Sequence, residues 1–339
     1  DPNRNMVIRI TDPELLAANV PLLKQTKFLN PYVGLWRRKD FKKRAVKMME
    51  ADFGIPKRET EGAVDAAYAA YDAYVQDVRQ TGKAYIDYAR AHGMPIIVVC
   101  GRPYHIDPEI NHGINDLITS FGFVLVTEDA LSYLEGYAPR KVLNQWTFQS
   151  RMYNAARYVC TQSDMQVVQL VSFGCGTDAI TTDELRSILE SGGKLYTQLK
   201  IDDINNLGAV KIRIRSLMAA MDARRAREKA LYLLEHRSHS KKELIEKIQR
   251  TTSKEAARSA ADRMEELGLV NDEEFAKRYA AELFNRKGFS GRRAQYELLQ
   301  KGIDKEIIAQ VVEELEPNPV EKIKEIIEKK YLRCLQDEK

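Results

Sequence analysis

Hydrophobic residues recur along this chain with different periods in different segments. Between residues 63 and 91 apolar side chains return every three or four positions, which predicts an amphipathic helix. After Gly93 and Pro95 the apolar residues instead form short continuous runs, the pattern of strands that are buried on both faces. These strand candidates cover residues 95–100, 123–126, 167–173 and 194–201.

Helical patterns separate the strand candidates, at residues 110–120, 140–158 and 182–190. Strands that alternate with helices are typical of a parallel sheet with crossover helices. The sequence therefore predicts an α/β domain over residues 1–221.

Beyond Met221 strand patterns end, and Ala, Glu, Lys, Arg and Leu dominate the composition. An ungapped self-comparison at an offset of about 51 residues aligns apolar positions with each other, for example Ala230 with Ala281 and Ile248 with Leu299. We expect residues 222–339 to form an all-α domain of tandem three-helix repeats, with two complete repeats and a third that stops after one helix.

Turn-forming residues predict where the helices of the repeats end, near residues 237–239, 251–253, 288–291 and 301–304. Asp272 is the expected N-cap of the helix that opens the second repeat, because its carboxylate can accept hydrogen bonds from free backbone amides.

Composition places the chain among soluble globular proteins, with 44% hydrophobic and 30% charged residues. The net charge of +4 is small for 339 residues, so charge alone does not indicate a nucleic-acid-binding protein. No apolar stretch is long enough to span a membrane and no signal peptide is recognisable, which predicts a cytoplasmic location. The charged first residues, without Met, suggest a piece of a longer protein.

Three segments of the second domain resemble the RecX family of recombination regulators. They are ALYLLEHRSHSKKELIEKI (230–248), GLVNDEEFAKRYA (268–280) and KGFSGRRAQYELLQKGIDKEII (287–308). The resemblance implies a non-enzymatic protein without a required cofactor, built of three-helix repeats. It implies binding in the groove of a RecA filament on single-stranded DNA, which limits recombination and modulates DNA repair in the SOS response.

Cations at the starts of two helices are the candidate partner-binding residues. In the self-comparison Arg292 and Arg293 align with Lys241 and Lys242, so positive charge recurs at one place in both repeats. Such a surface suits an acidic filament or DNA phosphates. The alternative is a solvated helix face whose charge is balanced by neighbouring glutamates. The predicted surface consists of Lys241, Lys242, Lys247, Arg292 and Arg293.

The first domain resembles a different family. The segments CGRPYHIDPEINHGI (100–114), VSFGCGTDAITTDEL (171–185) and residues 194–217 are similar to the C-terminal portion of large activase-related proteins of 2-hydroxyacyl-CoA dehydratase systems. That resemblance implies iron–sulfur clusters held by cysteines and an ATP-dependent activator. No glycine-rich phosphate loop is recognisable, so we do not expect ATP hydrolysis by this chain.

Cys175 and Cys100 are the candidate iron–sulfur ligands. Cys175 lies between two glycines after one predicted strand, and Cys100 ends another, so both sulfurs are expected at the same edge of a parallel sheet. Plain burial is the alternative for both, and burial is expected for Cys160. A complete cluster would need sulfur from missing upstream domains or from another subunit. His105 and His112 belong to a polar loop after Cys100. Its residues are equally typical of a turn and a helix cap.

Three functions remain open from the sequence. The chain is a RecX-like regulator of RecA that carries a passenger domain, or an iron–sulfur redox component with a helical tail, or the product of two neighbouring genes joined without functional meaning. The first is favoured, because its motifs are present through two repeats.

Overall fold

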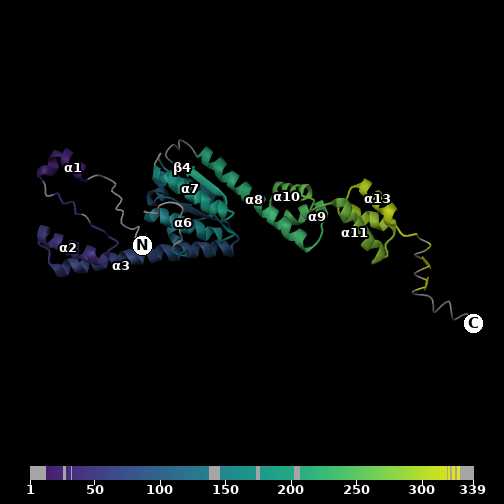
Figure 1. Cartoon of the computed structure of the whole chain (residues 1–339), viewed down its shortest axis with the longest axis horizontal. Coiled ribbons are helices and arrows are strands. Elements are labelled where there is room, and N and C mark those ends of the chain that lie inside the picture. Colours follow the sequence, from purple (N-terminus) through teal and green to yellow (C-terminus); the bar gives the residue numbers. More distant parts are fainter. Residues whose placement is uncertain are drawn as a thin grey trace, which may run out of the picture. The chain divides into compact units, whose positions relative to one another are not determined.

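The structure is a computed structural model that describes residues 13–25, 28–31, 33–136, 146–172, 176–201, 207–318, 320, 323–324 and 327–328. It divides into two compact units, unit 1 (Asp1–Ile214) and unit 2 (Arg215–Lys339). Figure 1 shows the elements of each unit. Helix α8 (Gly208–His236) runs through this division and also through residue 221. The domain boundary at residue 221 stays a prediction.

Unit 1 contains a parallel sheet of four strands, as the sequence predicts. The strands are β1 (Ile96–Cys100), β2 (Val124–Thr127), β3 (Met165–Val171) and β4 (Tyr196–Lys200). They lie in the order β2-β1-β3-β4 and every neighbouring pair is parallel. All residues of β1 and β3 are buried, which explains their continuous apolar sequences.

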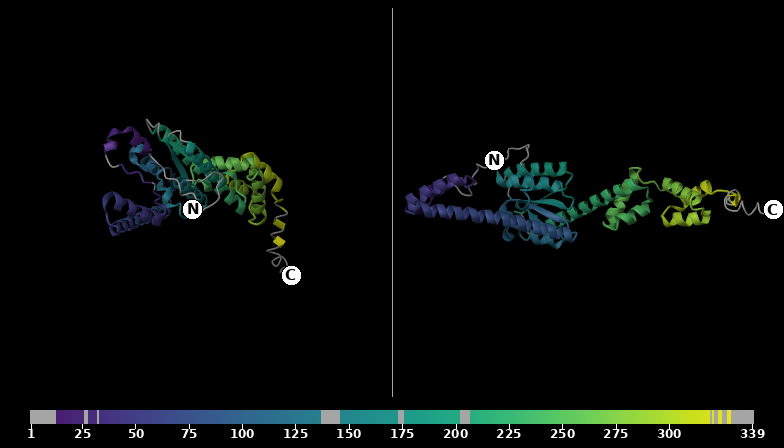
Figure 2. Two further views of the ribbon diagram at one scale, coloured as in Figure 1. Left: turned by 60° about the vertical axis from the view of Figure 1, so that its left-hand side comes forward. Right: turned by 90° about the horizontal axis from the view of Figure 1, so that it is seen from below.

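Helices cover both faces of this sheet. The β1 residues Ile96, Val98 and Cys100 share one core cluster with residues of α3 (Lys57–Ala91), α6 (Thr147–Cys160) and α7 (Gly176–Ser191). Figure 2 shows the long α3 running across unit 1. Helix α5 (Ile114–Ser120) packs on β2, and a right-handed crossover puts it on the opposite face from α6 and α7. The remaining elements of unit 1 are α1 (Pro13–Asn19), η1 (Pro21–Gln25), α2 (Arg38–Phe53), η2 (Pro103–Ile106), α4 (Pro108–Asn111) and η3 (Glu128–Ala130).

The strand order creates a switch point between β1 and β3. The chain leaves β1 toward β2 on one side and leaves β3 toward β4 on the other. The carboxyl ends of β1 and β3 therefore lie at the place where open α/β sheets bind their ligands.

Unit 2 is helical throughout its described residues, which confirms the predicted all-α second domain. The last part of α8 is followed by α9 (Lys241–Ile248) and α10 (Lys254–Glu266), which together form the first repeat. The second repeat consists of α11 (Asp272–Asn285), α12 (Gly291–Gln300) and α13 (Lys305–Leu315). Each repeat has its own hydrophobic cluster. The third repeat expected from the sequence lies almost entirely outside the described residues, as does Cys334.

In the structure, the register between the two repeats differs from the one that the self-comparison of the sequence predicts. The N-cap serines of the second helices are Ser240 and Ser290, and the buried Leu244 and Ile248 correspond to the buried Ala294 and Leu298. The offset is therefore 50 residues here, since 290 minus 240 is 50. It becomes 51 only at the third helices, whose N-caps are Ser253 and Asp304. The ungapped alignment is wrong by one position for the second helices, because one extra residue precedes the third helix of the second repeat.

Two consequences follow from the corrected register. Arg292 corresponds to Lys242, whereas Arg293 corresponds to Glu243 and Lys241 to Gly291. The sequence predicts two pairs of equivalent cations, and in the structure only Lys242 and Arg292 are equivalent.

The helix that opens the second repeat is capped by a different residue from the one expected. Asn271 is the N-cap, and its Oδ1 accepts hydrogen bonds from the backbone N–H groups of Glu273 and Glu274. Asp272 instead accepts a hydrogen bond from the backbone N–H of Lys241 at 2.8 Å. Its carboxylate therefore caps α9 from the other repeat.

Helices of the described residues are too short or too polar to span a lipid bilayer.

Candidate functional site

Lys241 forms ion pairs inside the first repeat. Its Nζ lies 2.6 Å from Oδ1 of Asp262 and 2.7 Å from Oε2 of Glu265, both on α10. Hydrogen bonding to Asp262, and then to Glu265, raises the pKa of Lys241. Because two carboxylates neutralise this ammonium group, Lys241 joins α9 to α10 and offers little charge to a partner.

Lys247 is also used within unit 2. Its Nζ donates a hydrogen bond to Nε2 of His239 at 3.0 Å, and Oε1 of Glu243 lies 3.7 Å away. His239 is 2% exposed, and burial lowers its pKa. The other ring nitrogen, Nδ1, donates to the backbone oxygen of Arg237 at 2.9 Å, because Nε2 is the acceptor for Lys247. Lys247 therefore holds the turn before α9.

Arg292 and Lys242 occupy equivalent positions and keep most of their exposure. The Lys242 side chain is 50% exposed, and its Nζ donates to the backbone oxygen of Gln300 at 3.3 Å. Arg292 is exposed and has no hydrogen-bond or ion-pair partner within the described part of the chain. Of the five predicted cations, Arg292 is therefore the one without such a partner in the part of the chain that the structure describes.

Arg293 and Glu297 form an ion pair of 2.6 Å on α12. In the corrected register they correspond to Glu243 and Lys247, which also lie four residues apart with opposite charges. The second repeat therefore contains the same pair with its charges exchanged. The guanidinium group of Arg293 also lies over the rings of Phe289 and Tyr296, at 5.7 and 5.3 Å from their centroids.

Glu243 is the central charge between the two repeats. Its carboxylate accepts from Arg237 of the first repeat at 2.5 Å, and Nζ of Lys301 from the second repeat lies 3.4 Å away. Burial alone would raise the pKa of Glu243, but the hydrogen bond from Arg237 and the charge of Lys301 outweigh it and lower the pKa to about 2. The carboxylate is therefore ionised and stabilises the contact between repeats.

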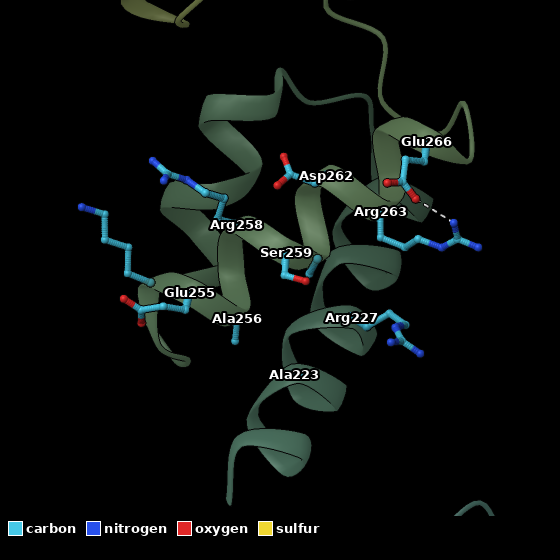
Figure 3. A pocket seen from close by; sticks show the side chains of 11 residues that line it. Ala223, Arg227, Glu255, Ala256, Arg258, Ser259, Asp262, Arg263 and Glu266 are labelled. Atoms are coloured by element: carbon cyan, nitrogen blue, oxygen red, sulfur yellow. Dashed lines mark hydrogen bonds and ion pairs between the residues drawn. The ribbon is translucent and has the colours of Figure 1, made fainter. Parts of the chain in front are cut away.

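A groove of about 730 Å³ lies between α8 and α10 of the first repeat, and we call it the α8–α10 groove. Figure 3 shows Ser259 and Ala256 between Arg258 on one side and Arg227 and Arg263 on the other. Its full lining is Ala223, Arg227, Lys254, Glu255, Ala256, Arg258, Ser259, Ala260, Asp262, Arg263 and Glu266.

Some charged residues of this groove form ion pairs within the chain, and others do not. Arg263 pairs with Glu266 at 2.7 Å, and Asp262 pairs with Lys241. The exposed side chains of Arg227, Lys254 and Arg258 form no ion pair or hydrogen bond within the described residues. The α8–α10 groove thus presents three cations that a ligand can neutralise.

In unit 1, Cys100 lies in the hydrophobic core. It is completely buried in a cluster with Tyr153 and Met152 of α6. Burial, and then the nearby charge of Glu128, raise the pKa of the Cys100 thiol well above its usual value. Within the described residues no three His, Cys, Asp or Glu side chains converge as metal ligands. The role of Cys100 as an iron–sulfur ligand stays a prediction. Cys175 lies outside the described residues.

A polar network occupies the switch point of the sheet. Nδ1 of His105 accepts from the backbone N–H of Arg102 at 3.1 Å, so Nε2 carries the proton and donates to Oγ of Ser172 at 3.0 Å. Burial lowers the pKa of His105 to about 4, so the ring is neutral at pH 7. Because Nε2 is already protonated, His105 cannot accept the Ser172 proton, and the pair is not arranged as a nucleophile and base. Arg102 also pairs with Asp178 of α7 at 2.8 Å.

The second repeat coincides with a known protein family. A family model described as the second three-helix domain of RecX matches residues 271–312, which span α11, α12 and most of α13. Several bacterial proteins that are named "Regulatory protein RecX" are similar to the chain. The relative from Trichlorobacter lovleyi is 30% identical over 105 residues, 30% of this chain and 68% of the relative. The chain belongs to the RecX family.

Two further RecX relatives have higher identity but lower coverage. The Caldanaerobacter subterraneus protein is 37% identical over 113 residues, 32% of this chain and 57% of its own length. The Chlorobium phaeobacteroides protein is 36% identical over 96 residues, 28% of this chain and 64% of its own length. The chain thus spans less than two thirds of the length of these two RecX proteins.

Outside the RecX-like part, a second family model matches residues 7–131 and is described as a CoA enzyme activase uncharacterised domain. The match includes β1 and β2 and ends before β3. Both recognised resemblances of the sequence are therefore confirmed, each in its own unit.

The groove of the RecX-like unit was not predicted from the sequence. Lys254 and Arg258 lie four residues apart on α10, a spacing that indicates one helix face, but Arg227 belongs to another helix. Only the packing of α8 on α10 brings the three together. At the switch point, the sequence singled out the loop of His105 and His112 but not its partners Ser172 and Asp178.

Proposed function

We propose that unit 2 is a RecX-type regulator that binds RecA filaments on single-stranded DNA in the cytoplasm and limits recombination during DNA repair. The observation that carries this proposal is the match to the second three-helix domain of RecX, whose residues 271–312 coincide with the folded second repeat. The RecX relatives support the same assignment.

The contacts within unit 2 support a binding surface as the means of action. Its buried histidine, His239, is held by Arg237 and Lys247 in a turn, where it serves structure. The carboxylates beside Lys241 form ion pairs that join helices. A protein of this kind acts by occupying a site on its partner, and its charged surface determines where it binds.

The two repeats are connected in a way that favours such binding. Ser240 Oγ donates to the backbone oxygen of Lys301 at 2.7 Å, and Lys242 and Glu243 also contact the second repeat. Because these contacts hold the repeats in one arrangement, less conformational freedom is lost when both bind a periodic filament. Lys242 and Arg292 then lie at equivalent places on consecutive repeats, as a periodic partner requires.

Co-sedimentation of the full chain with RecA filaments on single-stranded DNA tests the proposal, together with inhibition of RecA strand exchange. We expect the chain to sediment only when filaments are present and to slow strand exchange in proportion to its concentration. Failure to sediment with filaments at low salt would contradict the proposal, because electrostatic contacts are strongest there.

Unit 1 has a second candidate function, as a component of CoA enzyme activation, which the match over residues 7–131 favours. In that case the chain takes up iron and sulfide under anaerobic conditions and becomes brown. Absorbance near 400 nm after reconstitution separates this function from that of a passenger domain.

A further inference from the structure

The α8–α10 groove has features that the predicted basic helix starts lack. Lys241 and Lys247 are neutralised or bonded inside unit 2. In contrast, Arg227, Lys254 and Arg258 line one concave surface from two helices and have no ion pair or hydrogen bond in the described chain. Unpaired cations on both sides of a groove indicate an anionic ligand.

We infer that the α8–α10 groove binds a short acidic segment of a protein partner. Small side chains line the groove between its charges, and Ala256 and Ala260 are 8% and 5% exposed. A floor of alanine leaves room for the backbone and aliphatic carbons of a peptide, while the cations bind its carboxylates. Arginine is well suited to this role because its guanidinium group binds a carboxylate through two hydrogen bonds.

The same lining disfavours nucleic acid. Asp262 and Glu266 are paired with Lys241 and Arg263, but Glu255 also lines the groove, has no ion pair within the described residues and would repel a continuous chain of phosphates. The lining contains no aromatic residue on which bases could stack. A short peptide whose carboxylates alternate with small residues avoids both difficulties, because it can place carboxylates beside the cations and an uncharged residue beside Glu255.

The inference depends on the proposed function for one point only, that the partner is a RecA filament. The chemistry of the groove, with its three cations and alanine floor, stands independently of that identity. We therefore separate the two by measuring a peptide and a filament with the same variants.

The first measurement is the fluorescence anisotropy of a labelled peptide of alternating glutamate and alanine, titrated with the full chain at low salt. The groove variant is R227A/K254A/R258A, and the matched control is R278A/R286A/K305A, which removes the same charge from exposed positions of the second repeat. Five of the six positions lie within helices, where alanine is favoured, and Arg286 is the C-cap of α11, so circular dichroism should remain that of the wild-type chain.

We expect the groove variant to bind the peptide at least about tenfold more weakly and the control to stay within about twofold of wild type. Equal weakening in both variants would overturn the inference, since it would show attraction by net charge alone. No peptide binding by the wild-type chain would also overturn it. If the triple variant loses helicity, the single exposed change Arg258→Glu provides the test, with a weakening of about threefold or more expected.

Two further measurements identify the partner. If single-stranded DNA displaces the peptide from the wild-type chain and binds less well to the groove variant, the groove is a nucleic-acid site and the inference is wrong. In co-sedimentation, a wild-type chain that binds peptide but not RecA filaments contradicts the proposed function and leaves the groove assignment standing. A groove variant that fails with peptide and also with filaments supports both.

Discussion

The carboxylate of Glu243 on α9 lies 3.4 Å from Nζ of Lys301, which follows α12, and this ion pair joins the two repeats of unit 2. The side chain of Glu243 is only 12% exposed, so solvent screens the pair weakly. The position equivalent to Glu243 in the second repeat is Arg293, which pairs with Glu297 on its own helix.

Glu243→Gln should destabilise unit 2 by about 2 to 3 kcal/mol at pH 7, since the pKa of Glu243 is lowered to about 2 from 4.5 in the unfolded chain. A carboxylate whose pKa is lower in the folded chain stabilises the fold at pH values above its unfolded pKa. This stabilisation is lost as the pH falls toward the folded pKa. The difference between wild type and variant should therefore shrink below about pH 5 and vanish near pH 2. Urea unfolding followed by circular dichroism at several pH values measures it.

Glu246→Gln is the control for this prediction. Glu246 is 61% exposed and lies 4.0 Å from Lys242, so its removal should change stability by less than about 0.5 kcal/mol. Both tryptophans, Trp36 and Trp146, lie in unit 1, so their fluorescence should be unaffected by either change. A loss of stability in Glu243→Gln that does not depend on pH would show that the charge is not the cause.

Lys241 and Arg292 should behave differently when each is replaced by alanine. Lys241→Ala leaves Asp262 and Glu265 without their shared cation and should destabilise unit 2 by about 1 kcal/mol. Arg292→Ala should leave stability within about 0.5 kcal/mol. If the filament contacts Arg292 and not the internally paired Lys241, sedimentation with RecA filaments should show weaker binding by the Arg292 variant and wild-type binding by the folded Lys241 variant. The reverse result would show that Lys241 contacts the filament.

Gly101→Ala should destabilise unit 1 by about 1 to 3 kcal/mol. A Cβ atom on Gly101 would lie 2.7 Å from Nδ1 of His105, which is buried and bonded to Ser172. Gly62→Ala on α3 is the matched control, because no atom lies within 4 Å of a Cβ added there. Alanine in place of glycine within a helix stabilises the fold by up to about 1 kcal/mol. Tryptophan fluorescence during urea unfolding measures both. Equal stability of the two variants would show that His105 moves without cost.

Iron uptake tests the two cysteine candidates separately. If anaerobic reconstitution loads the chain, Cys175→Ser should abolish uptake, because its position between two glycines exposes the thiolate. Cys100→Ser should bind the same amount of iron, since Cys100 is buried in the core. Iron content measured after desalting decides between them, and a loss with Cys100→Ser alone would show that the core opens to a cluster.

Separation of the chain after Met221 should yield two folded fragments. On α8 the buried residues Val210, Ile214 and Leu217 precede the cut, and the next fully buried residues, Ala226 and Ala230, follow it. The hydrophobic cluster of the first repeat includes Ala226 and Ala230 but none of the three residues before the cut, so the cut leaves that cluster whole. Calorimetry of the fragments should reproduce the two transitions of the intact chain, whereas a fragment without a transition would show that α8 is needed whole.

Sequence periodicity determined the architecture of this protein, because burial requires a defined spacing of apolar residues in each type of element. The short continuous apolar run Ile96–Cys100, which follows Gly93 and Pro95, indicates a strand covered on both faces, and the structure confirms it. The recurring helices of residues 222–315 bury their apolar faces against each other, as a helical repeat predicts. Motifs that lie contiguously in the chain also identified both families.

Tertiary structure decided which charges remain available to a partner. Lys241 and Arg292 look alike in the sequence, yet packing of α9 against α10 places two carboxylates beside Lys241, whereas Arg292 on α12 forms no ion pair within the described residues. The repeat register and the α8–α10 groove likewise depend on how helices distant in sequence meet. Periodicity within one helix specifies which face is buried, but the charges that neutralise its exposed face come from other helices, and only their packing brings them within a few ångströms.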